Sequence, residues 1–123
     1  MVAFNGLAPW SDDVPKVDFD TPAGLVDLHN CADLVGIQVL IAEQSVEFEF
    51  RYAPDHTQIE SAGRPVRLRF GSVTGLRISQ AEDFDIRAAD TLEGVTRHSG
   101  SEFVVDLGDI QCTFAAESVT LIQ

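Results

Sequence analysis

Three histidines are the residues of this chain best suited to metal binding or proton transfer: His29, His56 and His98. None stands in the Cys-x-x-Cys or His-x-x-x-His spacing that indicates a zinc site. Asp27 and Asp33 flank His29, so a short helix there would place carboxylates beside an imidazole, which is a weak metal-binding or acid–base pattern. Hydrogen-bonded structural use of these groups is the favoured interpretation, and we expect no metal.

Other patterns of catalysis or cofactor binding are missing from the sequence. Asp18-Phe19-Asp20 and Glu82-Asp83-Phe84-Asp85 resemble fragments of calcium loops, but neither continues into the full ligand array with its terminal Glu. Cys31 stands two residues after His29 in the sequence. On a helix, side chains at this spacing point to different faces, so the two residues do not form a catalytic pair. The stretch from Gly71 to Gly75 lacks the nucleophile-elbow spacing, and no phosphate-binding glycine loop is present. We therefore predict neither enzymatic activity nor a cofactor.

Acidic residues outnumber basic residues by 20 to 8, which gives the chain a net charge of −12. Phosphate backbones and anionic membranes repel such a chain, so we expect neither nucleic acid nor a membrane as partner. An acidic surface attracts a basic protein instead. The candidate binding residues are carboxylates of the N-terminal segment and of an acidic loop: Asp12, Asp13, Asp18, Asp20, Glu82, Asp83 and Asp85. Acidity that serves only solubility is the alternative.

Apolar and polar residues alternate over most of the chain, which predicts strands rather than helices. In the clearest run, Val46, Phe48 and Phe50 lie on one face and Glu47 and Glu49 on the other. Several such runs, separated by turn residues, predict a mainly β fold. We expect an antiparallel sandwich or a partly open barrel of six to eight strands with one short helix.

Local signals place further elements around that run. Arg67 and Arg69 alternate with apolar residues, and if their strand pairs with the Val46 strand, the arginines face Glu47 and Glu49. Gly108-Asp109 is typical of a two-residue hairpin turn. The short helix is expected within Ala23–Leu34, because leucines recur there at helical spacing. The stretch from Pro54 to Pro65 is expected to be a loop.

The length fits one domain. We expect residues 1–24, rich in Asp, Pro and Gly, to form an irregular arm packed on a single β domain of residues 25–123. The residues expected to anchor the arm are Phe4, Leu7, Trp10, Val17 and Phe19. The residues expected in the core are Phe48, Phe50, Leu68, Phe70, Ile78, Val105, Ile110, Cys112 and Phe114. A disulfide between Cys31 and Cys112 stays open, because sequence does not establish the geometry that it needs.

No segment of the sequence is typical of export or membrane insertion. The first ten residues lack a basic region, and no apolar run approaches the roughly 20 residues needed to span a bilayer. We therefore expect a cytoplasmic protein.

The run from Leu28 to Ile37 resembles the opening of certain small bacterial β domains. It is followed by Val46–Phe50, by Val66–Phe70, by Val73–Ile78 and by a terminal hairpin. This order is similar to immunity-like proteins of bacterial polymorphic toxin systems, among them the immunity protein 50 family. Asn30-Cys31 departs from the Asp and small residue expected at that turn. The resemblance implies an inhibitor that binds a cognate toxin.

We therefore expect a non-enzymatic protein-binding domain, with an immunity-like inhibitor of a basic toxin as its specific form. Toxin nucleases are often basic, and acidic inhibitors associate quickly with basic proteins. Two alternatives stay open. One is a β-rich structural or oligomerisation module within a homo-oligomer or a larger complex, and the other is a small ligand-binding protein whose cavity the sequence does not reveal.

Overall fold

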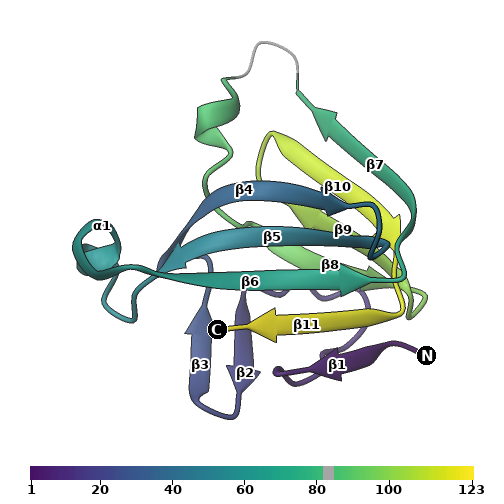
Figure 1. The fold of residues 1–123 in the computed structure, drawn as a ribbon, viewed down its shortest axis with the longest axis horizontal. Helices are drawn as coiled ribbons and strands as arrows, with labels where there is room; N and C mark the ends of the chain where they lie inside the picture. The colour runs from purple at the N-terminus through teal and green to yellow at the C-terminus, as the bar shows by residue number, and fades with distance from the viewer. Residues whose placement is uncertain (82–84) are drawn as a thin grey trace.

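Eleven strands dominate the part of the chain that this computed structural model describes, residues 1–81 and 85–123. They form a five-stranded sheet, a four-stranded sheet that faces it, and a two-stranded ribbon (Figure 1). The sheets stay open at their edges, so the fold is a sandwich and not a closed barrel. This confirms the expected mainly β class. Strands β4 to β11 correspond to the region where six to eight strands were predicted.

The five-stranded sheet joins both ends of the chain to a central hairpin. Its order is β1 (Ala3–Asn5), β11 (Ser118–Ile122), β6 (Arg64–Gly71), β5 (Ser45–Tyr52) and β4 (Ala32–Leu40). All neighbours are antiparallel except β1 and β11, which run parallel. The register places Glu47 opposite Arg69 and Glu49 opposite Arg67. The predicted pairing of the glutamate and arginine strands is therefore confirmed.

The four-stranded sheet is antiparallel throughout. Its order is β7 (Thr74–Gln80), β10 (Ile110–Ala115), β9 (Glu102–Asp106) and β8 (Gly94–His98). The predicted Gly108-Asp109 turn joins β9 to β10, and Gly108 has a φ of 82°, which glycine adopts at little steric cost. The chain crosses between the two large sheets from β6 to β7 and from β10 to β11, both at the same end of the sandwich (Figure 1).

The prediction of a helix within Ala23–Leu34 is wrong. Those residues form β3 (Gly24–Asp27), a turn, and the start of β4. The carboxylate of Asp27 accepts hydrogen bonds from the backbone N–H groups of His29 and Asn30, and this local bonding favours a turn over a helix.

The one α-helix of the described residues is α1 (Ile59–Ala62), which follows the 3-10 helix η1 (His56–Gln58) in the stretch predicted to be a loop. A second 3-10 helix, η2 (Ile86–Ala88), precedes β8. No described helix has the length and apolar character that a membrane crossing requires.

The segment expected to be an irregular arm, residues 1–24, contains two short strands. β1 extends the large sheet, and β2 (Asp18–Thr21) pairs with β3 in the ribbon. Leu7, Trp10 and Phe19 are buried, and the Trp10 ring packs edge-to-face against Phe4 and Phe19. The segment therefore contributes part of the core, because its apolar side chains fill space that the two large sheets leave open.

Phenylalanines from both sheets form the centre of the core. Phe70 on β6 packs against Phe103 on β9 and Phe114 on β10, with ring centroids 5.1 and 4.8 Å away. Of the residues expected in the core, Ile78 is the exception, because half of its side chain is exposed. Ile78 lies opposite the buried Cys112, on the face that the alternation of the strand predicts. Because β7 is an edge strand, however, the side chain of Ile78 lies at the rim of the sheet.

Both cysteines are free, so the structure contains no Cys31–Cys112 disulfide. Burial raises the pKa of the Cys112 thiol to about 11, which agrees with its expected role as a small buried side chain.

Candidate functional site

Most of the acidic residues predicted to bind a partner have basic neighbours within the chain. The contacts are Asp12 with Arg97 (3.9 Å), Asp13 with His98 (2.6 Å), Asp18 with Lys16 (3.7 Å) and Asp85 with Arg87 (2.6 Å). Exposed ion pairs contribute little to stability, but Arg97, Lys16 and Arg87 offset the fields of their carboxylates, and His98 occupies an oxygen of Asp13 with a hydrogen bond. These acids therefore attract a foreign cation less than unpaired carboxylates do.

The predicted acids do not form one surface. The structure distributes the described ones over separate places: Asp12 and Asp13 beside β8, Asp18 and Asp20 on β2, and Asp85 directly before η2. β2 lies at the bottom of Figure 1, and the segment of η2 lies at the top. Asp20 has no ion pair with any described residue. Glu82 and Asp83 lie outside the described residues.

Arg97 on β8 holds the N-terminal segment against the sandwich. Its Nη1 donates a hydrogen bond of 2.8 Å to the carbonyl of Trp10, and its guanidinium lies 4.8 Å from the centre of the Phe4 ring. Its Nε and Nη2 donate to the carbonyl of Gly100. These contacts fix the backbone before Asp13 and so position the Asp13–His98 pair next to the groove described below.

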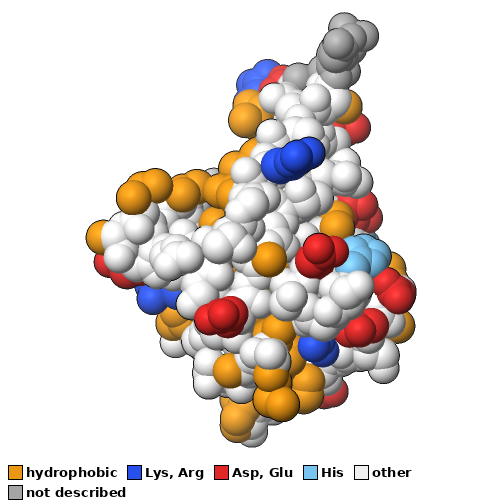
Figure 2. All heavy atoms as spheres, turned by 90° about the vertical axis from the view of Figure 1, so that its right-hand side faces the viewer, with side chains coloured by type: hydrophobic (Ala, Val, Ile, Leu, Met, Phe, Trp, Pro, Cys, Tyr) orange, Lys and Arg blue, Asp and Glu red, His pale blue; other side chains and the backbone are white. Residues whose placement is uncertain are grey.

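Two hollows meet at the end of the sandwich where the chain crosses between sheets. A groove of about 430 Å³ crosses β7, β9 and β10 and is lined by Arg77, His98 and Glu102 among others. A second hollow of about 390 Å³ includes Glu117, and the two share Thr74 and Ala115. Figure 2 looks onto this end and shows acidic side chains around a histidine on its surface.

We call this region the acidic end and define it by Asp13, Thr74, His98, Glu102 and Glu117. Glu102 and Glu117 are exposed, and neither forms an ion pair with any residue in the described part of the chain. Their charges are therefore available to a partner. The sequence prediction missed both glutamates because each stands alone in sequence. Only the pairing of β10 with β9 and β7 brings the segments that carry them to two adjoining hollows.

The Asp13–His98 pair is the most enzyme-like feature of the acidic end. A histidine bonded to a carboxylate forms two parts of a nucleophile-activating triad, and the hydroxyl-bearing Thr74 and Thr113 line the same groove. The Asp13 side chain is, however, 73% exposed, so water weakens its effect on the imidazole. Within residues 1–81 and 85–123, no three His, Cys, Asp or Glu side chains are grouped to hold a metal.

The other histidine pattern is structural, as expected. Nδ1 of His29 lies 2.7 Å from the carbonyl of Leu92 and so ties the turn before β4 to the segment before β8. Partial burial raises the pKa of Asp27, but hydrogen bonds from Asn30 and His29 outweigh it and lower the pKa below its usual value. The Asp27 carboxylate is therefore occupied by its own turn.

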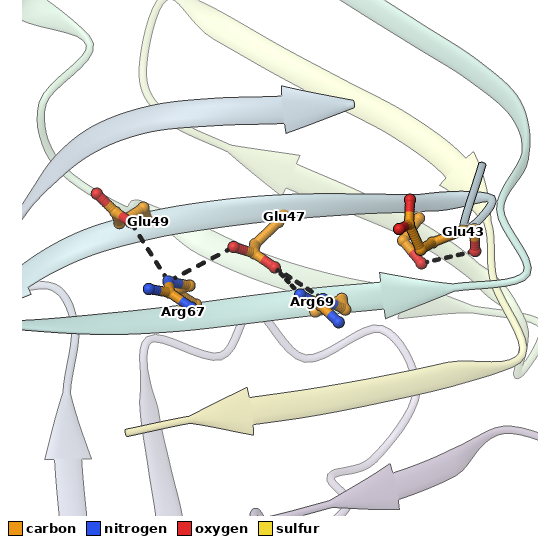
Figure 3. A network of polar contacts seen from close by, with 6 residues as sticks. Glu43, Glu47, Glu49, Arg67 and Arg69 are labelled. Atoms are coloured by element: carbon orange, nitrogen blue, oxygen red, sulfur yellow. Dashed lines mark hydrogen bonds and ion pairs between the residues drawn. The ribbon is translucent and has the colours of Figure 1, made fainter. Parts of the chain in front are cut away.

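A second polar network lies on the outer face of β5 and β6 (Figure 3). Glu47 is buried and accepts a hydrogen bond of 2.7 Å from Nε of Arg69, while Arg67 bridges Glu47 and Glu49. Two acids and two bases neutralise one another here. These pairs account for the two arginines of β6 without a ligand, and the network offers a partner no net charge.

Comparisons with known proteins identify the fold and not a function. No protein family model matches the sequence, and no curated protein matches it. The structure is similar to the crystal structure of an uncharacterized protein from Neisseria gonorrhoeae, with a TM-score of 0.50 and 13% sequence identity. The match covers 77% of this chain and 92% of the other. At this identity the similarity shows a shared β fold alone, because one fold serves many functions.

Proposed function

We propose that this chain is a non-enzymatic protein-binding domain whose acidic end receives a basic partner. The observation that carries the proposal is the position of Glu102 and Glu117: both are exposed, unneutralised by described residues, and placed at hollows that share Thr74. A lysine or arginine that enters such a hollow gains a charge-assisted hydrogen bond.

The specific form of the proposal is an inhibitor of a basic toxin, in line with the resemblance to immunity-like proteins. The net charge of −12 accelerates encounter with a basic protein over distances near the Debye length. Apolar parts of the lining, Val104 and Phe114 among them, supply contact area once the partner has arrived.

Parallel affinity capture from the lysate of the source organism tests the proposal. Three baits are compared by quantitative mass spectrometry: wild type, Glu102→Gln/Glu117→Gln, and the control Asp18→Asn/Asp20→Asn, which removes the same charge from β2. We expect a basic protein to be enriched by wild type and control and to be lost with the acidic-end variant.

The captured protein is then produced in pure form, and its association is followed by stopped flow. Raising salt from 0.1 to 1 M shortens the Debye length from about 10 to about 3 Å, so the on-rate should fall steeply. Equal capture by all three baits, or an on-rate that ignores both salt and the acidic-end substitutions, would overturn the proposal.

A further inference from the structure

The five-stranded sheet ends at β1 and β4, and the four-stranded sheet ends at β7 and β8. β1 has three residues, so it leaves only a short edge. Residues 13–16 run along β8, where Lys16 and Val95 exchange backbone hydrogen bonds of 2.9 and 2.8 Å. In the described part of the chain, no strand covers the outer side of β4 or β7. Figure 1 shows β4 as the outermost strand of its sheet, on the side away from β1.

The open part of β4 begins after Leu34. The N–H of Leu34 points away from β5 and donates a hydrogen bond of 2.7 Å to the carbonyl of Asp90. The register of β4 with β5 shifts by one residue between Leu34 and Gly36. Beyond this shift, the alternation of an antiparallel ladder directs the N–H and C=O groups of Ile37 and Val39 away from β5, to the open side of β4. These groups are able to pair with another strand.

The side chains of this edge are uncharged and, except for Gln38, apolar. Residues 34–42 carry no charged side chain, in a chain in which 23% of residues are charged. Val35, Val39 and Ile41 are 62, 43 and 84% exposed. Natural edges are protected by lysine, proline, inward charges or β-bulges. Of these, residues 34–42 have only the irregularity between Leu34 and Gly36. The edge from Ile37 to Leu40 lies beyond it and favours pairing.

Hollows flank the edge on both faces of the sheet. One of about 320 Å³ lies between Val39, Ile41 and Leu76, where the rims of the two sheets approach each other. Another of about 230 Å³ is lined by Val35 and Ile37 together with Gln38, Glu47 and Glu49. A strand added beside β4 therefore finds apolar space on one face of the sheet and a hollow of mixed polarity on the other for its alternating side chains.

We propose that the β4 edge pairs in antiparallel fashion with the β4 edge of a second copy of this chain. An isologous pair needs a self-complementary surface, and antiparallel strands of the same sequence provide one. The absence of free charge is the reason for choosing a second copy: a basic segment finds no carboxylate within residues 34–42, and Glu47 and Glu49 in the hollow beside them are paired with arginines of β6. Two identical edges meet there without like charges in contact.

This pairing has a salt dependence opposite to that of basic-partner binding. Each copy carries a net charge of −12, so long-range repulsion opposes the dimer and added salt relieves it. The dimer surface also leaves Glu102 and Glu117 untouched. A failure of this inference is therefore separable from a failure of the proposed function.

Sedimentation equilibrium over a range of protein concentration and salt tests the inference. We expect wild type to dimerise, with a dissociation constant that falls as salt rises. Val35→Lys/Val39→Lys should weaken the dimer about tenfold or more, as lysine does on natural edge strands. The control Leu25→Lys/Ile86→Lys changes the charge equally at two sites that are 57 and 63% exposed, and it should dimerise like wild type or better.

Hydrogen exchange at two protein concentrations provides a readout that needs no substitution. The amides of Ile37 and Val39 should gain protection as the concentration rises, while those of β7 should not. Three results would overturn the inference: a monomer at all concentrations and salts, equal dimerisation by the edge variant and wild type, or concentration-dependent protection that excludes β4.

Discussion

Replacing Phe70 with alanine should remove the contact that joins the two sheets. Phe70 is fully buried, and its ring centroid lies 5.8, 5.1 and 4.8 Å from those of Phe48, Phe103 and Phe114. Phe→Ala in a core costs about 3–5 kcal/mol, and aromatic pairs contribute about 0.5–1.5 kcal/mol each beyond burial. With three such neighbours, we expect a loss of about 4–5 kcal/mol for Phe70→Ala.

That loss is a large share of the roughly 5–15 kcal/mol that stabilises a natural domain, and it corresponds to a melting temperature lower by roughly 15–20 °C. Urea denaturation followed by fluorescence measures it, because Trp10 is the only tryptophan and is 8% exposed. Phe70→Leu keeps most of the buried volume and should cost roughly 1–2 kcal/mol.

Leu25→Ala is the control for Phe70→Ala, because Leu25 is 57% exposed, and it should change stability by less than about 0.5 kcal/mol. A loss below about 1 kcal/mol for Phe70→Ala would refute the view that the β6 phenylalanine joins the sheets.

Three further predictions concern single polar groups. Glu47→Gln should cost about 1–3 kcal/mol in chemical denaturation, because the buried acceptor of two arginines is weakened, whereas Asp85→Asn, at an exposed pair, should leave stability unchanged. Because the pKa of Asp27 is lowered in the folded protein, its carboxylate stabilises the fold above its usual pKa of 3.8, and this stabilisation is lost as pH falls through the lowered pKa. Asp27→Asn should therefore reduce the loss of stability at acid pH. An unchanged loss of stability at acid pH would contradict this. A thiol reagent should label Cys31 slowly in the native protein and Cys112 only after unfolding, because Cys112 is fully buried with a pKa of about 11. Labelling of both cysteines in the native protein would contradict this prediction.

The alternation along β5 and β6 was sufficient to predict their faces, their pairing and the Glu47–Arg69 ladder. A two-residue period on a half-buried sheet leaves one face to the core and one to water, so the pattern reports the structure directly. The turn at Gly108 was predictable for a similar reason, because a two-residue hairpin needs a residue that tolerates positive φ.

The structure of the N-terminal third of the chain was predicted less accurately. Leu25 and Leu28 stand at helical spacing, but the hydrogen bonds that Asp27 accepts and the pairing of β3 with β2 decide against a helix. Short apolar segments fit either period, and only the surrounding sheets select one. Ile78 is a second example: the face of the sheet on which it lies was predicted correctly, but its exposure depends on the position of β7 at the edge of the sheet.

The sequence by itself determined the fold class, the opposing charges of β5 and β6 and the net acidity of the chain. Only the tertiary structure placed Glu102 and Glu117 at joined hollows, paired four of the predicted acids with bases, and left the uncharged β4 at an open edge. The physical reason is that periodicity and composition act between near neighbours, whereas a site and an edge arise from strands that meet after long separations in sequence.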